Sequence, residues 1–409
     1  MRSVLRLSSF RHLLVSETLW WLALWMDFLA VGWITLELTN SPFLVALVKF
    51  YRMIPAVLIG VFAGVIIDRF GRRRVIILAQ CTQCGVAFAM ALLFWTGKAA
   101  YWQLAVAAFI LGSAWAIDFP ARRSLVPDLV GKERTSDAII LGAIVTNGAR
   151  VLGPLAGGLI TQYYGPLGCF LFLGFVWLLP LYFLKKLPKG TISRDSIPSA
   201  KSSWKQLTEG FDYARRNQVI LAVLLITMTM NFLGFPFMTL LPVFARDVFN
   251  VEAAGLGLIG MASGLGSLLG ILIVYRLKSI IPGGMIYAAG TFGFTLAILL
   301  FALSKSFLIS FAILFIGGIG HSCFGVMQSS LMLTLSSDEM RSRAMGLVVL
   351  AIGVSPFGQL LVGTLASEYG APFAVKLSAS LAAFLLILIV LILPPIWRAG
   401  NLTTRKLES

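Results

Sequence analysis

The sequence predicts an all-α integral membrane protein, with twelve transmembrane helices in two pseudo-symmetric six-helix bundles. The chain is 58% hydrophobic and only 12% charged over 409 residues, whereas soluble domains carry about 25% charged residues. Apolar runs of roughly 20 residues, the length that spans a bilayer, recur along the whole chain. The second half of the sequence also repeats features of the first. No stretch outside the apolar runs is long enough to form a soluble core.

The apolar runs define the predicted spans, each placed to within a few residues. They are 13–36, 43–67, 75–95, 101–120, 137–161, 168–184, 218–241, 254–275, 283–303, 307–330, 344–367 and 373–393. The first run is too long for the apolar core of a signal peptide, and no small-residue cleavage site follows it. We therefore expect it to remain as the first transmembrane helix.

The charge distribution predicts the topology. The formal net charge of +16 alone would suit a nucleic-acid-binding protein, but the basic residues lie in short segments between apolar runs. With the N-terminus in the cytoplasm, only Lys98, Arg246 and Lys305 fall in outside loops. Lys and Arg concentrate in cytoplasmic loops of membrane proteins. The asymmetry predicts a multi-pass protein of the cell membrane with both termini inside, and its partner is the lipid bilayer, not a nucleic acid.

An internal repeat relates the two halves at an offset of 205 residues: Gly148 and Gly165 recur as Gly353 and Gly370. Duplicated bundles are a common design of transporters, which hold the substrate between the repeats near the midplane. The predicted domains are an N-terminal six-helix bundle over 1–185, a cytoplasmic linker with an interfacial helix over 186–216, and a C-terminal bundle with a short cytoplasmic tail over 217–409.

One loop between the second and third spans combines glycines with a dense block of charge, and it reads Gly64-Val-Ile-Ile-Asp68-Arg69-Phe-Gly71-Arg72-Arg73-Arg74. Such a block cannot enter hydrocarbon, so it predicts a tight loop at the cytoplasmic surface, where the glycines let two helices approach closely. The loop resembles the signature G-x-x-x-D-R-x-G-R, followed by two basic residues, of the major facilitator superfamily. The resemblance implies the major facilitator fold.

A second motif lies in the fifth span, where Arg150 is followed by Gly153-Pro154-Leu-Ala-Gly157-Gly158. Glycines permit close contact with a neighbouring helix, and a proline bends the span. The pattern resembles the export motif of the same superfamily, although Ala149 stands at its first glycine position. The alternative interpretation is generic helix packing.

Four further stretches narrow the resemblance: Ala30-Val-Gly-Trp33, Leu38-Thr-Asn-Ser41-Pro42, Pro120-Ala-Arg122 and Leu241-Pro-Val-Phe-Ala-Arg246. They are similar to the drug:proton antiporter branch that contains enterobactin and macrolide exporters. This resemblance implies a monomeric secondary transporter of the bacterial inner membrane that exports amphipathic small molecules, drug-like or siderophore-like, by alternating access and proton antiport. One departure is Ala108, which stands four residues before Gly112 where proton-coupled exporters often carry an Arg, so coupling through that position is excluded.

Motifs for other chemistries are missing from the sequence. It contains no G-x-x-x-x-G-K-S/T loop, serine triad, metal-ligand cluster or catalytic carboxylate pair. We therefore expect no enzyme activity, no cofactor and no metal. Two alternatives to export stay open: a lipid or lysolipid transporter of the same fold, and a membrane sensor or scaffold that does not transport.

Charges within the spans are candidates for function, because burying an ion in the membrane is costly. With a rise of roughly 1.5 Å per residue, Asp27 and Arg52 lie at similar depth on neighbouring helices. Lys49 shares a face with Arg52, and Arg150 lies near the middle of its span. We expect a mid-membrane cluster with excess positive charge that prefers anionic or zwitterionic substrates; the structural alternative is a salt-bridge network that only ties helices together.

Proton coupling needs a titrating side chain within the spans. The candidates are Asp27, Asp118 and His321, because a histidine titrates near neutral pH and the repeat places His321 opposite Ala116, close to Asp118. The candidates for the substrate cavity are Trp25, Asp27, Lys49, Arg52, Arg150, Asn231 and Gln328.

The sequence also predicts a cytoplasmic gate. Asp68, Arg72 and Arg73 lie in the signature loop, whereas Asp338 and Glu339 precede the eleventh span on the same face. In the related fold the signature loop packs beside that span, which implies an ion pair between the halves that stabilises the outward-facing state. The alternative is that the two acids only offset local positive charge.

Overall fold

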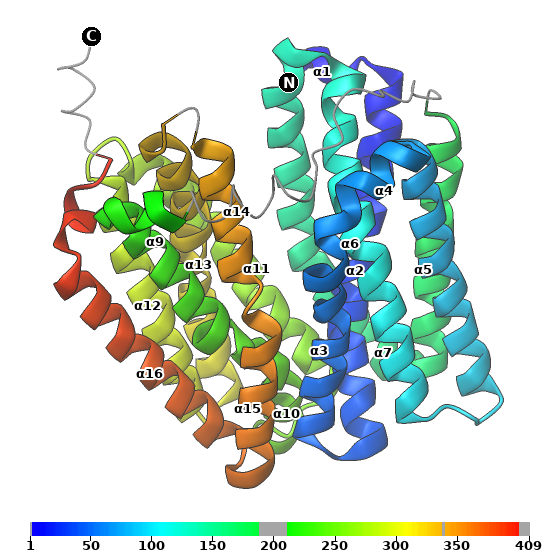
Figure 1. Cartoon of the computed structure of the whole chain (residues 1–409). Coiled ribbons are helices and arrows are strands. Elements are labelled where there is room, and N and C mark those ends of the chain that lie inside the picture. The colour runs from blue at the N-terminus through cyan, green and yellow to red at the C-terminus, as the bar shows by residue number, and fades with distance from the viewer. Residues whose placement is uncertain (1, 188–210, 338–339, 401–409) are drawn as a thin grey trace. The chain divides into compact units, whose positions relative to one another are not determined.

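Every regular element that the structure describes is a helix (Figure 1). The structure is a computed structural model that describes residues 2–187, 211–337 and 340–400. The chain divides into two compact units, of which unit 1 comprises Met1–Ile197 and Ala245–Met261, and unit 2 comprises Pro198–Phe244 and Ala262–Ser409. The predicted linker lies mostly outside the described residues, apart from a helical stretch at 211–216. The predicted domain boundaries therefore stay predictions.

The N-terminal half of the chain forms long helices and several short helical turns, joined by short loops. They are α1 (Arg2–Leu5), α2 (Ser8–Thr39), α3 (Pro42–Ile59), η1 (Gly60–Phe62), α4 (Ala63–Phe70), α5 (Arg72–Trp95), α6 (Tyr101–Val130), η2 (Lys132–Arg134) and α7 (Thr135–Lys185).

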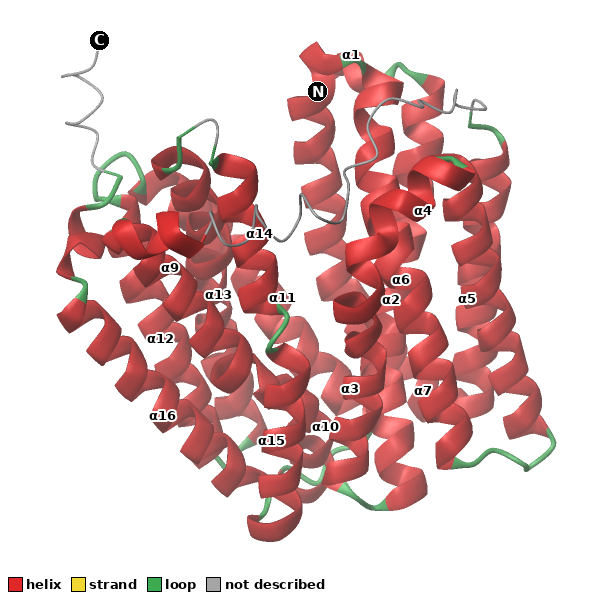
Figure 2. Cartoon of the chain, in the orientation of Figure 1, coloured by secondary structure: helices red, strands yellow, loops and turns green. Residues whose placement is uncertain are grey.

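The C-terminal half begins with one helical segment, Gln218–Val248, that changes several times between α-, π- and 3-10-helix, and loops separate its later helices (Figure 2). They are α9 (Gln218–Thr229), η3 (Met230–Gly234), η4 (Phe235–Leu240), α10 (Leu241–Val243), η5 (Phe244–Val248), α11 (Ala253–Leu277), α12 (Gly283–Leu303), α13 (Phe307–Leu335), α14 (Arg341–Ile352), α15 (Ser355–Tyr369), α16 (Ala371–Ile392) and η6 (Pro394–Arg398).

The predicted fold class of twelve transmembrane helices is confirmed. Within the described ranges, eleven helices are long and apolar enough to cross a membrane, and one of them, Asp137–Lys185, has 49 residues. This helix breaks at Gly165, where φ is 66° and ψ is −173°, so it contains two spans. Gly370, the repeat partner of Gly165, also has a positive φ of 85°. The repeat is thus visible in the backbone as well as in the sequence.

Two predicted spans have different boundaries in the structure. The second ends as a helix at Ile59 and continues through a short turn into α4. The fourth does not stop at residue 120, because α6 runs on through Pro120 and Pro127 to Val130. Proline is tolerated within membrane helices when neighbouring groups satisfy the freed backbone. The longer α6 brings residues that the sequence assigned to a loop into the body of unit 1.

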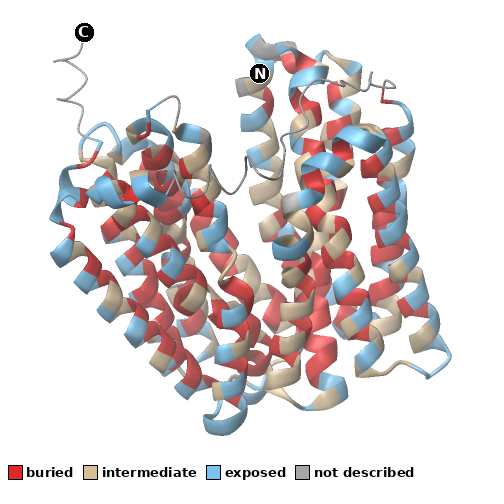
Figure 3. Cartoon of the chain, in the orientation of Figure 1, coloured by how far each residue is buried: buried red, intermediate tan, exposed pale blue. Residues whose placement is uncertain are grey.

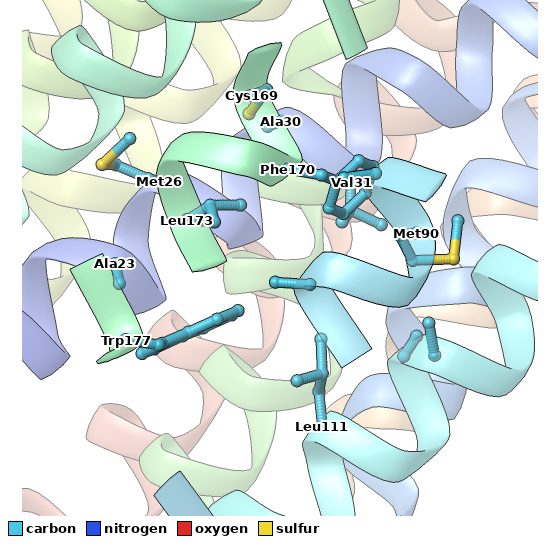
Figure 4. Close-up of a cluster of buried hydrophobic side chains, with 14 of the residues drawn as sticks. Ala23, Met26, Ala30, Val31, Met90, Leu111, Cys169, Phe170, Leu173 and Trp177 are labelled. Atoms are coloured by element: carbon cyan, nitrogen blue, oxygen red, sulfur yellow. The ribbon is translucent and has the colours of Figure 1, made fainter. Parts of the chain in front are cut away.

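Apolar side chains of α2, α5, α6 and α7 form the core of unit 1, with Trp177, Phe170 and Met26 among the most buried (Figure 4). Buried and exposed residues alternate along most helices (Figure 3). In unit 2, a Cβ on Gly270 of α11 would come within 2.8 Å of the Cα of Ile319 in α13. Gly270 therefore allows α11 and α13 to pack closely.

Candidate functional site

The structure brings together three predicted site residues inside unit 1. The Arg52 Nε on α3 donates to the Asp27 Oδ2 on α2 over 3.4 Å, and both side chains are less than a tenth exposed. The Lys49 Nζ, also on α3, lies 3.6 Å from the centroid of the Phe28 ring. The three formal charges give the cluster an excess of one positive charge.

The Asp27 cluster, defined as Asp27, Lys49 and Arg52, keeps unused hydrogen-bonding capacity. The Asp27 Oδ1, the Lys49 Nζ and the Arg52 Nη2 are buried without a hydrogen-bond partner among the described residues. A cavity of about 10 Å³ touches all three side chains, and its other walls, such as Ala108 and Leu111, are apolar. Buried polar groups without partners are rare in folded proteins and call for an explanation. The Asp27 cluster therefore differs from a salt bridge in which every hydrogen-bonding atom of the side chains has a partner.

Close helix packing holds the cluster in place. Gly112 of α6 lies against the backbone carbonyl of Arg52, and a Cβ at this position would clash with that oxygen. Ser41 caps α3, because its Oγ accepts the Leu44 N–H over 3.3 Å, and Pro42 follows at the first helical position. The glycine contact sets the distance between α3 and α6, and the cap sets the residue at which α3 begins.

Arg150 and Trp25 form a pair elsewhere in unit 1. The Arg150 Cζ on α7 lies 5.3 Å from the centroid of the Trp25 ring on α2, within the range of a cation–π contact. Gly153 and Gly157 pack against Trp25 and Met26, so a Cβ at either glycine would contact α2 closely. Lys49 and Arg150 thus both lie on aromatic rings of α2, as does Arg122 on the Trp20 ring.

The export motif also contacts the start of α11, which belongs to unit 1. A Cβ on Gly257 would lie 2.7 Å from the Pro154 carbonyl oxygen, and Gly158 lies against the Ala253 backbone. Gly153 and Gly157 thus face α2, whereas Pro154 and Gly158 face α11. The helix-packing interpretation accounts for all four residues of the motif.

A second buried ion pair connects four helices of unit 1. The Arg122 guanidinium donates to the Asp118 Oδ1 over 2.8 Å, to the Ser16 Oγ over 3.0 Å and to the Gln80 Oε1 over 2.8 Å. Gln80 in turn donates to the Trp177 carbonyl over 2.7 Å. The sequence analysis named Asp118 as a candidate site residue, but Arg122 only as part of the Pro120-Ala-Arg122 stretch, because it ended the fourth span at residue 120. The spacing of four residues between Asp118 and Arg122 was the available signal.

The candidates in unit 2 lie in a neutral network. The Gln328 Nε2 donates to the Thr227 Oγ1 over 2.6 Å, and the Asn231 Nδ2 donates to the Thr227 carbonyl over 2.9 Å. The Tyr287 hydroxyl lies 3.2 Å from the same Thr227 hydroxyl. The structure therefore brings Asn231 and Gln328 together through a threonine that the sequence analysis did not name.

His321 lies among aromatic rings of unit 2. Its ring centroid is 5.1 Å from that of Phe235 and 5.2 Å from that of Phe294. These aromatic rings give His321 surroundings that differ from those of Asp27 and Asp118, which both contact an arginine.

The signature loop is held within unit 1. Arg72 forms an ion pair with Asp128 of α6, and Arg73 donates to the carbonyls of Leu184 and Lys185 over 3.1 and 2.7 Å. Gly71 has a φ of 82°, a conformation that favours glycine.

The expectation that the loop glycines let two helices approach closely is wrong for Gly64, because a Cβ there would meet nothing within 4 Å. Arg69 lies near the Phe70 ring, 5.7 Å from Cζ to centroid, and Asp68 lies on α4. The acids of the predicted gate, Asp338 and Glu339, lie outside the described residues. The gate therefore stays a prediction.

A metal site has no candidate in the ranges that the structure describes, since no group of three His, Cys, Asp or Glu side chains there could hold an ion. What the Asp27 cluster offers instead is a buried carboxylate that can bind a proton, beside two cations that can attract an anion.

Comparisons with known proteins identify the family. The family model described as transmembrane secretion effector matches residues 2–407. The staphyloferrin A transporter of Staphylococcus aureus is 24% identical over 371 residues, which are 88% of this chain and 90% of that protein. An enterobactin exporter of Escherichia coli is 26% identical over 348 residues, 83% of this chain and 80% of that protein.

The fold is likewise shared with solved transporters. A D-xylose-proton symporter matches 95% of this chain and 98% of its own with a TM-score of 0.71, at 13% identity that shows the fold alone. The chain belongs to the transmembrane secretion effector family. It is a multi-pass membrane transporter of the major facilitator superfamily and not an enzyme, as the sequence predicted.

Proposed function

We propose that this transporter exports an amphipathic small molecule of siderophore type from the cytoplasm across a bacterial inner membrane, with both termini inside, by alternating access coupled to proton entry. The observation that carries the proposal is the Asp27 cluster, a buried carboxylate with two buried cations on adjacent helices. The names of the two relatives, a staphyloferrin A transporter and an enterobactin exporter, support the class of cargo.

Asp27 is the proposed proton carrier. Arg52 holds one of its oxygens, and the other has no hydrogen-bond partner. The groups that face it are Lys49 and Arg52 on α3 and the apolar Ala108 and Leu111 on α6. Protonation of Asp27 raises the formal charge of the cluster from +1 to +2 and removes the attraction between α2 and α3. A change of this size biases the equilibrium between two conformations.

The cations of unit 1 support a preference for anionic or zwitterionic cargo. Lys49 lies on Phe28 and Arg150 lies on Trp25, so each positive charge has an aromatic surface beside it. An amphipathic anion can use both kinds of contact, whereas a permanent cation is repelled by the excess positive charge. Asn231 and Gln328 are the proposed polar contacts for the cargo in unit 2. The transporter is proposed to work as a monomer, with no further subunit.

Transport into inverted membrane vesicles tests this function. An imposed pH gradient should drive accumulation of a radiolabelled siderophore in vesicles that contain the wild-type protein. Asp27→Asn should abolish the pH-driven accumulation and leave cargo binding measurable. Asp212→Asn, which changes an exposed acid at the start of unit 2, is the matched control and should transport like the wild type.

The outcome separates the alternatives. Accumulation of lysolipid in place of siderophore would favour the lipid transporter, and transport of neither would favour a sensor or scaffold. Full pH-driven transport by Asp27→Asn would remove Asp27 from the coupling mechanism.

A further inference from the structure

Unit 1 contains a second and larger cavity that shares no residue with the Asp27 cluster. Its volume is about 190 Å³, and its walls come from α2, α6 and α7. None of the candidate residues from the sequence analysis lines it. Its position beside Pro127 and Thr135 places it toward the end of the unit that carries the signature loop.

The walls of this cavity are aromatic. Trp20, Trp21 and Phe119 all line it. The rings of Trp21 and Phe119 meet edge to face, with centroids 6.1 Å apart, and those of Trp20 and Trp21 with centroids 4.9 Å apart. Trp115 stacks on the Phe119 ring with centroids 5.6 Å apart. A further planar ring can therefore pack against the edges of Trp21 and Phe119, an arrangement that aromatic rings favour.

The charged groups of the cavity are held in fixed positions. Arg122, only 2% exposed, lines the cavity while three of its N–H groups hold Asp118, Ser16 and Gln80. A guanidinium has five N–H donors, so two remain for a ligand. Arg123 also lines the cavity, with its Cζ 5.4 Å from the Phe119 centroid.

An acceptor faces these donors. The carboxylate of Glu17 lines the same cavity from α2. A ligand that suits the site therefore has an anionic group for the arginines and a hydroxyl that donates to Glu17.

The volume limits the size of the ligand. A cavity of about 150 Å³ in an apolar core accommodates one benzene molecule, whereas pockets for drug-sized ligands measure about 300–1,000 Å³. The cavity of about 190 Å³ thus fits one substituted ring and not a whole amphiphile.

We propose that this cavity is a subsite for one planar aromatic ring that carries an anionic group and a hydroxyl. The ring packs against the edges of Trp21 and Phe119, its anionic group binds Arg122 and Arg123, and its hydroxyl donates to Glu17. The proposal rests on the export function above, because the ring is then the part of the cargo that unit 1 binds.

Calorimetric titration of the purified full-length protein in detergent tests the subsite, with 2-hydroxybenzoate as the probe. Cyclohexanecarboxylate matches its charge and size but lacks the aromatic ring and the hydroxyl. We expect saturable binding of 2-hydroxybenzoate that is roughly tenfold tighter, since the aromatic contact and a charge-assisted hydrogen bond together supply about that factor. Equal affinity for the two probes would overturn the proposal.

Two variants locate the binding. Phe119→Leu and Arg123→Gln should each weaken the binding of 2-hydroxybenzoate by roughly tenfold. Both side chains line the cavity; Phe119 is half-buried against the core of unit 1, and Arg123 is exposed. Arg74→Gln, which removes an exposed arginine outside the cavity, should bind like the wild type. Wild-type affinity in both cavity variants would place the ligand elsewhere and contradict the subsite.

Transport in inverted vesicles distinguishes this proposal from the export function. Vesicles that transport a siderophore although 2-hydroxybenzoate does not bind would overturn the subsite alone. Binding of 2-hydroxybenzoate that depends on Phe119 and Arg123, without transport of any cargo, would support the subsite and overturn the export function.

Discussion

The two units bury different chemistry. Among the described residues, every charged side chain that is buried lies in unit 1: Asp27, Lys49, Arg52, Asp118 and Arg122. Unit 2 buries neutral hydrogen-bonding groups instead, such as Thr227, Asn231 and Gln328. Among the described residues, the buried charge is thus concentrated in one half of a duplicated fold.

The repeat shows how the halves diverged. At the offset of 205 residues, Asp27 corresponds to Phe232, Asp118 to Cys323 and Arg122 to Met327. One packing glycine recurs in both halves: Gly153 lies against α2 just before Asp27, and its partner Gly358 lies against the Phe232 backbone. At these positions the two halves share a helix contact but not the buried charges.

Breaking the second ion pair of unit 1 should have the largest effect. Arg122→Met leaves Asp118 buried without its cation, and removal of one partner of a buried pair costs about 3–5 kcal/mol. Thermal unfolding in detergent should show a large loss of stability, which the double variant with Asp118→Asn partly recovers. Arg74→Gln is the control, and a single variant that unfolds like the wild type would contradict this role of the pair.

Neutralising the excess charge of the Asp27 cluster should change selectivity. Lys49→Met brings the formal charge of the cluster from +1 to zero. The preference for an anionic over a matched quaternary ammonium competitor should then fall roughly tenfold, because a hydrogen bond to a charged group is worth about 1.5–3 kcal/mol. Lys376→Met, which changes an exposed lysine near Phe373 in unit 2, should leave selectivity unchanged. If the Lys49→Met variant kept the wild-type preference, residues other than Lys49 would have to determine the selectivity for the charge of the cargo.

A substitution in the neutral network of unit 2 should have a smaller effect than the two substitutions in unit 1. Gln328→Leu removes the hydrogen bond to Thr227, whose hydroxyl still bonds the Val223 carbonyl over 2.7 Å. We expect a loss of stability of about 0.5–1.5 kcal/mol and an unchanged pH dependence of transport. A shifted pH profile in this variant would show that unit 2 takes part in coupling.

The gate should give the smallest effect. Surface ion pairs are worth about 0–1 kcal/mol each, so Asp338→Asn with Glu339→Gln should shift the population modestly toward the inward-facing state. Distances between spin labels on cytoplasmic loops would report the shift. An unchanged distance distribution would remove these acids from the gate and leave the transporter assignment intact.

The sequence predicted the helices better than the site. Runs of apolar residues and the break at Gly165 follow from local composition, so the twelve spans were recognisable. The contact of Asp27 with Arg52 followed from equal depth in antiparallel helices. Arg122 and the cavity beside it were missed, because Pro120 and the adjacent arginines resemble a span end while tertiary contacts with Gln80 and Ser16 extend the helix.

Loop glycines were also misjudged, since Gly64 has the spacing of a packing residue but no neighbour. Conversely, the Thr227 network could not be derived, because which polar groups meet within a bundle depends on helix rotation that hydropathy does not specify.

The central claim is that a residue of unit 1, and not of unit 2, carries the coupled proton. Its most direct test is to measure proton release when cargo binds. A pH-sensitive dye in weakly buffered detergent solution would follow the release when the cargo identified in vesicles is added to purified protein. The account predicts equal release from the wild type and from His321→Gln, and none from Asp27→Asn. Undiminished release from Asp27→Asn, or its loss in His321→Gln, would contradict the account.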